Sequence, residues 1–335
     1  MPPLAFGLVY DLLGSRPRRP GDPSDFDAEF EPEETVALLE RAVRHLGHRP
    51  VRLGGPHDLL ASLGKGELPA LDVALSIAEG TRGRDRESWA PVLLQLAGVP
   101  ALGSDALTLS ATLDKLWAAR LVAAAGVPVL SQRSVRSRSE AETLRIPAPF
   151  PLFVKPRWEG TSKGIGPASR VEDRAGLVRE VERVVRDYDQ PALVEPFLAG
   201  PEYTVTVIGN APPRALPVLQ RALEASTGIG LHALEKHPAP PGGWRHVLPG
   251  ALDAAREAEL SELAVRAFEA LECRDFARAD FKLDAAGRPY FLEMNPLPTF
   301  HPEASFGILA ELAGRPVHEL VAEVLAGGLV RLGLA

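Results

Sequence analysis

Residues 276–296 read FARADFKLDAAGRPYFLEMNP, and the fold of the chain is decided here. Two mostly apolar runs, residues 275–283 and 289–293, flank the tetrapeptide DAAG, which is typical of a turn between antiparallel strands. Side chains alternate between the two faces of a strand, so residues two apart in each run share a face. The stretch therefore predicts a two-stranded unit with one polar face.

That polar face carries Arg278 and Asp280 on the first strand, and Glu293 and Asn295 on the second. Asp280, Glu293 and Asn295 offer the oxygen ligands that Mg²⁺ prefers when it is shared with nucleotide phosphates. Arg278 points a guanidinium into the same site, where it can stabilise charge developing on an acyl phosphate or tetrahedral intermediate. The alternative is a surface turn with solvated charges, which is disfavoured because all four residues fall on inward positions.

A second informative segment is FVKPRWEGTSKGIG, residues 153–166. An apolar run delivers Lys155, and a polar glycine-containing turn with Glu159, Gly160, Thr161 and Ser162 follows. Backbone N–H groups and hydroxyls in such a loop can cover phosphates, while the lysine neutralises them. Taken alone, the segment fits an ordinary hairpin equally well.

The third segment is LVEPFLAGPEYTV, residues 193–205, in which Glu195 ends one apolar run and Glu202 begins the next. Such a linker can contact an adenine edge and ribose hydroxyls. By itself it is better interpreted as a plain strand–loop–strand unit. Lys115 lies on a predicted helix, where a lysine is usually solvated.

Strands and helices alternate over the first 105 or so residues, which indicates a small parallel sheet. The whole chain is expected to be a mixed α/β protein of three units, residues 1–105, 106–190 and 191–335. Strands are predicted at 4–10, 50–53, 71–77, 151–155, 192–195 and 203–208, besides the pair above. Helices are predicted at 33–46, 89–97, 106–125, 171–187, 256–272 and 308–332.

The composition is that of an ordinary globular protein, with 335 residues, 45% hydrophobic and 24% charged. A net charge of −7 argues against nucleic acid or an anionic membrane as the main partner. Cys273 is the only cysteine, which excludes an intramolecular disulfide and suits the cytoplasm. No apolar run reaches the roughly 20 residues of a membrane helix, and the N-terminus is interpreted as a strand rather than a signal peptide.

Taken together and in this order, the segments resemble the D-alanine–D-alanine ligase family of the ATP-grasp superfamily. The family's GIPYTGS…DK run corresponds to residues 98–104 followed by Asp114 and Lys115. Its VKPxxEGSSxG run corresponds to residues 154–164, and its VExxxxGxExTV run to residues 194–205. Its RxDF…ExNxLPG run corresponds to residues 278–298. The resemblance covers nearly the whole chain.

The resemblance implies a three-domain ATP-grasp fold: a small parallel α/β domain, and two domains that clasp ATP. It implies a carboxylate–amine ligase that forms an amide through an acyl phosphate, with ATP and a pair of Mg²⁺ ions, for which Mn²⁺ can substitute. The substrates would be an amino acid or peptide carboxylate and an amine, and the chain would be a homodimer.

The resemblance also implies a role for each matching residue. Lys115 and Lys155 would hold phosphates, Glu195 and Leu198 would frame adenine, and Glu202 would bind ribose. The loop with Glu159, Gly160, Thr161 and Ser162 would close over the nucleotide, and Asp280, Glu293 and Asn295 would bind Mg²⁺. Arg278, Ser162 and Lys236 are the expected catalytic residues, Lys236 because Lys236-His237 stands for the family's lysine–tyrosine pair.

The substrate pockets depart from the family pattern. The N-terminal GGxSxExExS run is missing, and Asp27, Glu29 or Glu31 could supply its glutamate. The HGxxGEDG run is replaced by residues 78–87, AEGTRGRDRE, and Thr299 replaces a glycine. Three arginines of this run (Arg82, Arg84 and Arg86), together with Lys163, suggest an acidic substrate, although a solvated loop explains the arginines equally well.

Two alternatives stay open. One is an ATP-grasp ligase for a peptide or natural-product carboxylate, or one that makes esters. The other is a nucleotide-binding protein without catalytic activity, which the retained set of lysines, Arg278 and metal ligands disfavours.

Overall fold

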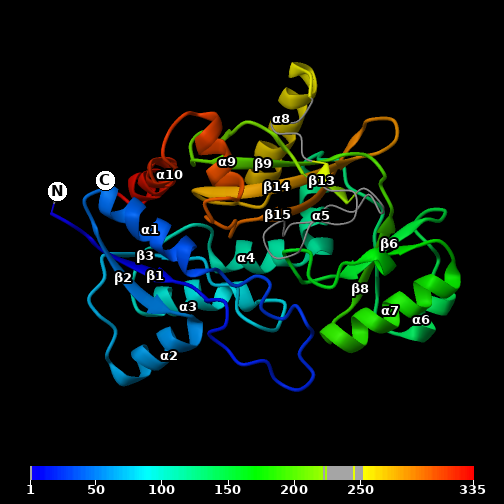
Figure 1. The fold of residues 1–335 in the computed structure, drawn as a ribbon, viewed down its shortest axis with the longest axis horizontal. Helices are drawn as coiled ribbons and strands as arrows, with labels where there is room; N and C mark the ends of the chain where they lie inside the picture. Colours follow the sequence, from blue (N-terminus) through cyan, green and yellow to red (C-terminus); the bar gives the residue numbers. More distant parts are fainter. Residues whose placement is uncertain (1, 222, 225–243, 246–251) are drawn as a thin grey trace.

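The structure is a computed structural model that describes residues 2–221, 223–224, 244–245 and 252–335. Within these ranges the strands form one parallel sheet, two antiparallel sheets and one short strand pair (Figure 1). The mixed α/β architecture expected from the sequence is confirmed. No helix within the described ranges is long and apolar enough to cross a membrane.

The parallel sheet is built from the first hundred residues, in the order β2-β1-β3-β4. Its strands are β1 (Ala5–Val9), β2 (Arg49–Gly54), β3 (Val73–Ser76) and β4 (Ala101–Leu102), and its helices are α1 (Glu33–His45), α2 (Pro56–Lys65) and α3 (Trp89–Leu96). β1 is buried along its whole length, as expected for the inner strand of a parallel sheet covered on both faces.

The central and C-terminal parts of the chain form the two antiparallel sheets. One has the order β5-β8-β6-β7 and the other β10-β9-β14-β15, with β11 also paired to β9. The strands are β5 (Arg133–Val135), β6 (Leu152–Pro156), β7 (Arg170–Val171), β8 (Ala192–Pro196), β9 (Glu202–Ile208), β10 (Arg214–Ala215), β11 (Leu219–Gln220), β14 (Phe276–Leu283) and β15 (Pro289–Asn295). The strand pair is β12 (Leu223–Glu224) with β13 (Trp244–Arg245).

Helices cover these sheets. They are α4 (Ala106–Leu113), α5 (Lys115–Ala124), α6 (Arg138–Thr143), α7 (Arg174–Tyr188), α8 (Ala254–Ala270), α9 (Ser305–Leu312) and α10 (Val317–Arg331). α8 packs its apolar side on β9 and β14, and α7 packs on β6. One hydrophobic core packs α1 and the parallel sheet against α9 and α10. Both chain ends lie on the side of the molecule where α1 and α10 pack (Figure 1).

Two predicted helices are each broken into two. The helix predicted at 106–125 ends at Leu113, because Asp114 leaves the helical conformation and caps α5 with its side chain on the Trp117 N–H. The helix predicted at 308–332 is divided by Gly314, at φ +64°, and Pro316. Glycine with positive φ and proline both end helices, so the sequence alone could have predicted this second break.

Candidate active site

One face of the larger antiparallel sheet carries a row of polar side chains. β14 pairs with β15 so that Asp280 lies opposite Glu293 and Arg278 opposite Asn295. On its other side β14 pairs with β9, which puts Thr204 beside Asp280 and Glu202 beside Lys282. The strand pairing therefore brings together the four residues that the sequence placed on one face.

Asp280 is almost completely buried, with 1% of its surface exposed. Its carboxylate accepts two hydrogen bonds of 3.0 Å from Arg278, through Nε and Nη2, and one of 2.5 Å from the Thr204 hydroxyl. Burial alone would lower the pKa of Arg278, but the carboxylates of Asp280, Glu293 and Glu202 raise it. Asn295 uses its side-chain oxygen to accept the Leu297 N–H at 2.9 Å.

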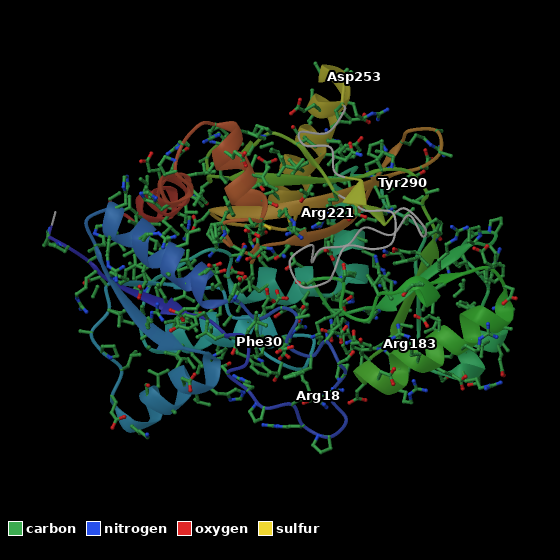
Figure 2. The ribbon with its side chains drawn as sticks, viewed as in Figure 1. Arg18, Phe30, Arg183, Arg221, Asp253 and Tyr290 are labelled. Atoms are coloured by element: carbon green, nitrogen blue, oxygen red, sulfur yellow. The ribbon has the colours of Figure 1, made fainter. Side chains whose placement is uncertain are left out.

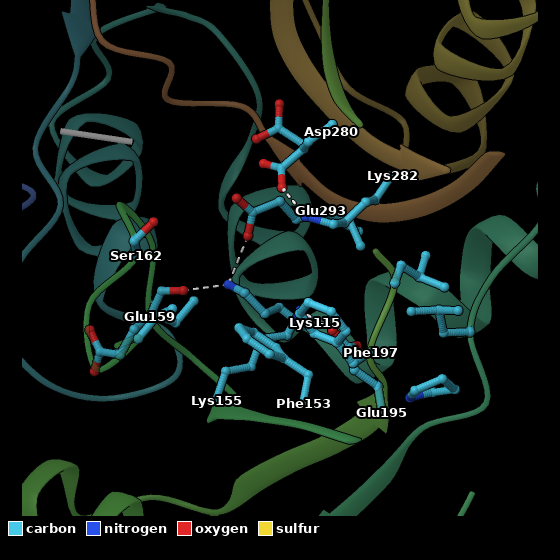
Figure 3. A pocket seen from close by; sticks show the side chains of 16 residues that line it. Lys115, Phe153, Lys155, Glu159, Ser162, Glu195, Phe197, Asp280, Lys282 and Glu293 are labelled. Carbon is cyan, nitrogen blue, oxygen red and sulfur yellow. Dashed lines mark hydrogen bonds and ion pairs between the residues drawn. The ribbon is translucent and has the colours of Figure 1, made fainter. Parts of the chain in front are cut away.

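Lys115 connects this sheet to the opposite side of the site. Its ammonium lies 2.9 Å from Glu293 Oε2 and donates to the backbone carbonyl of Glu159 (Figure 3). The side chain is buried, so the sequence-only interpretation of a solvated lysine is wrong. Burial would lower the pKa of Lys115, but Glu293, Glu29 and Glu159 raise it above its usual value.

Lys155 and Glu195 form the corresponding pair on the smaller antiparallel sheet. They come from the neighbouring strands β6 and β8, and the ammonium lies 2.7 Å from Glu195 Oε1. Gln132 donates to the other oxygen of Glu195 at 2.8 Å. Both charged side chains are buried and neutralise one another.

A pocket that is open at its mouth lies between the two antiparallel sheets. Its charged end has Lys115, Glu159, Ser162, Asp280, Lys282 and Glu293, and its other residues include Leu130, Phe153, Lys155, Glu195, Phe197, Leu198 and Glu202 (Figure 3). The site thus has an aromatic, apolar part for a flat ring and a charged part for anionic groups.

The loop after β6 is held by residues from the first ninety positions of the chain. Glu29 accepts the Gly160 N–H at 2.6 Å and the Lys163 ammonium at 2.9 Å. Arg86 donates to the same carboxylate at 2.6 Å. Burial alone would raise the pKa of Glu29, but Arg86, Lys163 and these hydrogen bonds lower it to about 2. Glu29 is therefore a charged structural contact of the loop in this structure.

A second contact holds the end of the loop. Asp25 accepts the Gly164 N–H at 2.9 Å and the Tyr188 hydroxyl at 2.9 Å. Between the two contacts, Thr161 and Ser162 adopt positive φ values of 45° and 55°. Glu159 and Ser162 line the pocket, whereas Gly160 and Thr161 are not among its described lining residues. The loop is bent tightly over the charged end of the pocket.

The four cations that suggested an acidic substrate all have carboxylate partners. Arg86 and Lys163 contact Glu29. Arg82 lies 2.7 Å from Asp22, and Arg84 lies 3.3 Å from Asp114. Because each charge is already compensated within the protein, these four residues do not by themselves indicate an acidic substrate.

Glu31 and Thr299, two of the departures from the family pattern, contact one another. Glu31 Oε2 accepts the Thr299 hydroxyl at 2.9 Å and the Thr35 hydroxyl at 2.8 Å. Lys236 and His237, in contrast, lie outside the described residues.

Sequence reasoning missed three residues of the polar row: Thr204, Lys282 and Arg221. Lys282 follows Arg278 and Asp280 at the same spacing of two, so strand periodicity could have found it. Thr204 and Arg221 reach the row because their strands pair with strands that are distant in sequence, and no comparable local pattern marks them.

Comparison with known proteins identifies the family. Residues 120–326 match the model described as D-ala D-ala ligase C-terminus. The chain is 32% identical over 334 residues to a D-alanine–D-alanine ligase of Ectopseudomonas mendocina, covering 99% of this chain and 97% of that one.

Two solved structures have the same fold. The VanG D-Ala:D-Ser ligase from Enterococcus faecalis superimposes with a TM-score of 0.72 at 19% identity, covering 97% of this chain and 99% of that one. The D-alanine–D-alanine ligase from Bacillus anthracis complexed with ATP gives 0.70 at 19% identity, covering 99% and 100%. The fold is thus the ATP-grasp fold, and the chain belongs to the D-alanine–D-alanine ligase family.

Proposed function

We propose that this protein is an ATP-dependent ligase that joins a carboxylate to an amine through an acyl phosphate. The observation that carries the proposal is the charged end of the pocket, where Asp280 and Glu293 lie on adjacent strands. Lys115 contacts Glu293, and Arg278 contacts Asp280 from behind the lining residues. Family membership and the ATP bound to the Bacillus anthracis ligase support it.

The nucleotide site divides into two parts. Phe153, Phe197 and Leu198 offer an apolar surface for adenine, with Glu195 at its edge. Glu202, at the start of β9, takes the ribose hydroxyls. Lys115 and Lys155 neutralise the phosphates, and the loop with Glu159, Gly160, Thr161 and Ser162 covers them.

The residues present fit Mg²⁺. Asp280 and Glu293 face each other across two strands, and both present carboxylate oxygens to the pocket. Asn295 adds an amide oxygen two positions after Glu293 on β15, which gives the hard-oxygen set that Mg²⁺ prefers. Bound there, the metal would neutralise phosphate charge, and Arg278 and Lys115 would then exchange their present carboxylate partners for phosphate oxygens.

The reaction needs no covalent enzyme intermediate. A carboxylate oxygen of the donor attacks the γ-phosphorus of ATP, the bond to the β-phosphate oxygen breaks, and ADP leaves. The amine then attacks the acyl carbon, and phosphate leaves with the donor oxygen. Arg278, with Ser162 and Lys236, is the proposed catalytic set, and it acts by holding the acyl phosphate and compensating its charge.

The substrates follow from family membership only as a class: an amino acid or peptide carboxylate and an amine. The contact of Glu31 with Thr299 supports the proposal that the amino-acid pockets differ from those of the family. We further assign the chain three working units, residues 1–105, 106–190 and 191–335, although β8 of the third unit pairs with β5 and β6 of the second, and a homodimer as the assembly.

The test is a product analysis with a matched variant pair. Purified protein is incubated with ATP, Mg²⁺ and a pool of D- and L-amino acids and dipeptides, beginning with D-alanine, and ADP and new amides are measured by mass spectrometry. Glu293→Gln should lower turnover by at least about 100-fold, whereas the exposed Glu303→Gln should not. Nucleotide binding by the wild type without any amide product would favour the non-catalytic alternative and contradict the proposal.

A further inference from the structure

Arg221 is a buried arginine that no motif of the family resemblance contains. It follows the short strand β11, whose residues Leu219 and Gln220 pair with β9. The Arg221 N–H donates to the Glu202 carbonyl at 2.8 Å, which continues the pairing by one residue. Its side chain is only 10% exposed. Figure 2 labels Arg221 at the larger antiparallel sheet.

The guanidinium of Arg221 lies between two carboxylates of the pocket. Its Nε is 3.6 Å from Glu202 Oε1, and its Nη1 is 3.7 Å from Asp280 Oδ2. Each carboxylate also has a cation of its own: Lys282 is 3.4 Å from Glu202, and Arg278 is 3.0 Å from Asp280. Arg221 is thus a cation that, among the described residues, these two carboxylates share.

Keeping this arrangement costs free energy, because a buried guanidinium loses its hydration. Burial, together with the like charge of Arg278, lowers the pKa of Arg221, while Asp280, Glu202 and Glu293 raise it. Two carboxylates in one buried row also repel one another, and a cation between them offsets that repulsion.

We infer that Arg221 is a positioning residue of the nucleotide site, which fixes Glu202 and Asp280 relative to each other. This inference rests on the proposed function, in which Glu202 takes the ribose and Asp280 takes the metal. Arg221 would then link recognition of the sugar to recognition of the metal-bound phosphates. Replacing Arg221 should weaken the binding of the ribose and the binding of the metal-bound phosphates more than other contacts of the nucleotide. Arg221 acts through Glu202 and Asp280, since it is not itself among the residues that line the pocket.

The experiment measures binding without turnover. Dissociation constants are determined by calorimetry for ADP and for 2′-deoxy-ADP, each with and without Mg²⁺, in the wild type, Arg221→Met, Arg221→Lys and Arg214→Met. Arg214 is the matched control, since it lies on β10 of the same sheet but is 56% exposed and pairs with Glu323. Two ratios are compared: the gain in affinity from Mg²⁺ and the gain from the 2′-hydroxyl.

Arg221→Met is expected to bind Mg²⁺–ADP about tenfold more weakly, the size expected for a lost contact to a charged group. Both ratios should fall toward one in this variant. Arg221→Lys should lie between it and the wild type, and Arg214→Met should match the wild type. If Arg221→Met does not fold, the two ratios in Arg221→Lys decide in the same way.

An equal loss for all four combinations of nucleotide and metal, or no loss at all, would overturn the inference and leave the proposed function standing. A wild type that binds none of these nucleotides would overturn both.

Discussion

Glu87, in the short turn Arg86–Ser88 of the N-terminal domain, is buried with 7% of its surface exposed. Burial raises its pKa to about 7, with Glu29 adding to the rise and Arg86 opposing it. The pKa of Glu79 is raised as well, by burial and then by Glu87. The folded state therefore keeps Glu87 mostly protonated at pH values below about 7, where a free glutamate has already lost its proton.

This raised pKa predicts a pH dependence of stability with a definite sign. Below about pH 4.5 Glu87 is protonated in both states and its stabilising contribution is complete; it is lost as the pH rises to about 7, because the unfolded chain has then released the proton. Glu87→Gln, which mimics the protonated acid, should match the wild type at pH 4.5 and be more stable at pH 8. The difference should reach at most about 3.5 kcal/mol, since the pKa rises from 4.5 to about 7 and one pKa unit corresponds to about 1.4 kcal/mol.

Urea unfolding at both pH values measures this difference. The exposed Glu269→Gln on α8 is the control, and it should follow the wild type at both pH values. A Glu87→Gln curve parallel to that of the wild type would contradict the assignment.

The loop of residues 159–164 behaves as an element that the N-terminal domain holds in place. Glu29→Gln keeps an oxygen for the Gly160 N–H but leaves Arg86 and Lys163 without that carboxylate charge. Removing one member of a buried ion pair typically costs about 3–5 kcal/mol, so we expect a loss of stability of that order. Amide hydrogen exchange in the loop should accelerate, and the KM for ATP should rise.

Asp27→Asn is the matched control for this experiment. Asp27 lies two residues before Glu29 in the same segment and is half-buried. Its variant should leave the unfolding curve and loop exchange unchanged. Equal effects of Glu29→Gln and Asp27→Asn would show that the contact has no special role in holding the loop.

The sequence predicted elements well where one local pattern was sufficient. The alternation of Arg278 and Asp280 with apolar neighbours predicted β14, and the pairing with Glu293 followed from the turn. The break at Asp114 was not predicted, because it depends on Arg157, which binds the Asp114 carboxylate through two hydrogen bonds of 2.7 Å. The place of Arg221 depends in the same way on a partner strand that is distant in sequence.

At the scale of the whole molecule, Asp275 connects three parts of the chain that are distant in sequence. Its buried carboxylate accepts two hydrogen bonds of 2.7 Å from Arg331 on α10. It also accepts the Gly103 N–H at 2.8 Å, next to β4, and the Asn210 amide at 2.9 Å, after β9. One side chain thus joins the parallel sheet, the larger antiparallel sheet and the last helix.

Arg331→Ala should therefore destabilise the molecule by about 3 kcal/mol, because it leaves a buried carboxylate without its cation. Arg315→Ala is the control: Arg315 pairs with Glu323, which is 40% exposed. That variant should cost less than about 1 kcal/mol, as exposed ion pairs contribute little. Thermal unfolding of both variants makes the comparison, and equal shifts would refute the role given to Asp275.

The central claim is that the pocket transfers a phosphoryl group from ATP to a carboxylate. It is tested most directly with a donor amino acid, first D-alanine, whose carboxylate carries ¹⁸O. After turnover with ATP, mass spectrometry of the inorganic phosphate should show one ¹⁸O atom for each amide formed, because that oxygen links the acyl group to the phosphorus. Amide formation with unlabelled phosphate, or with the label in AMP, would contradict the acyl-phosphate route and the site built on Arg278, Asp280 and Glu293.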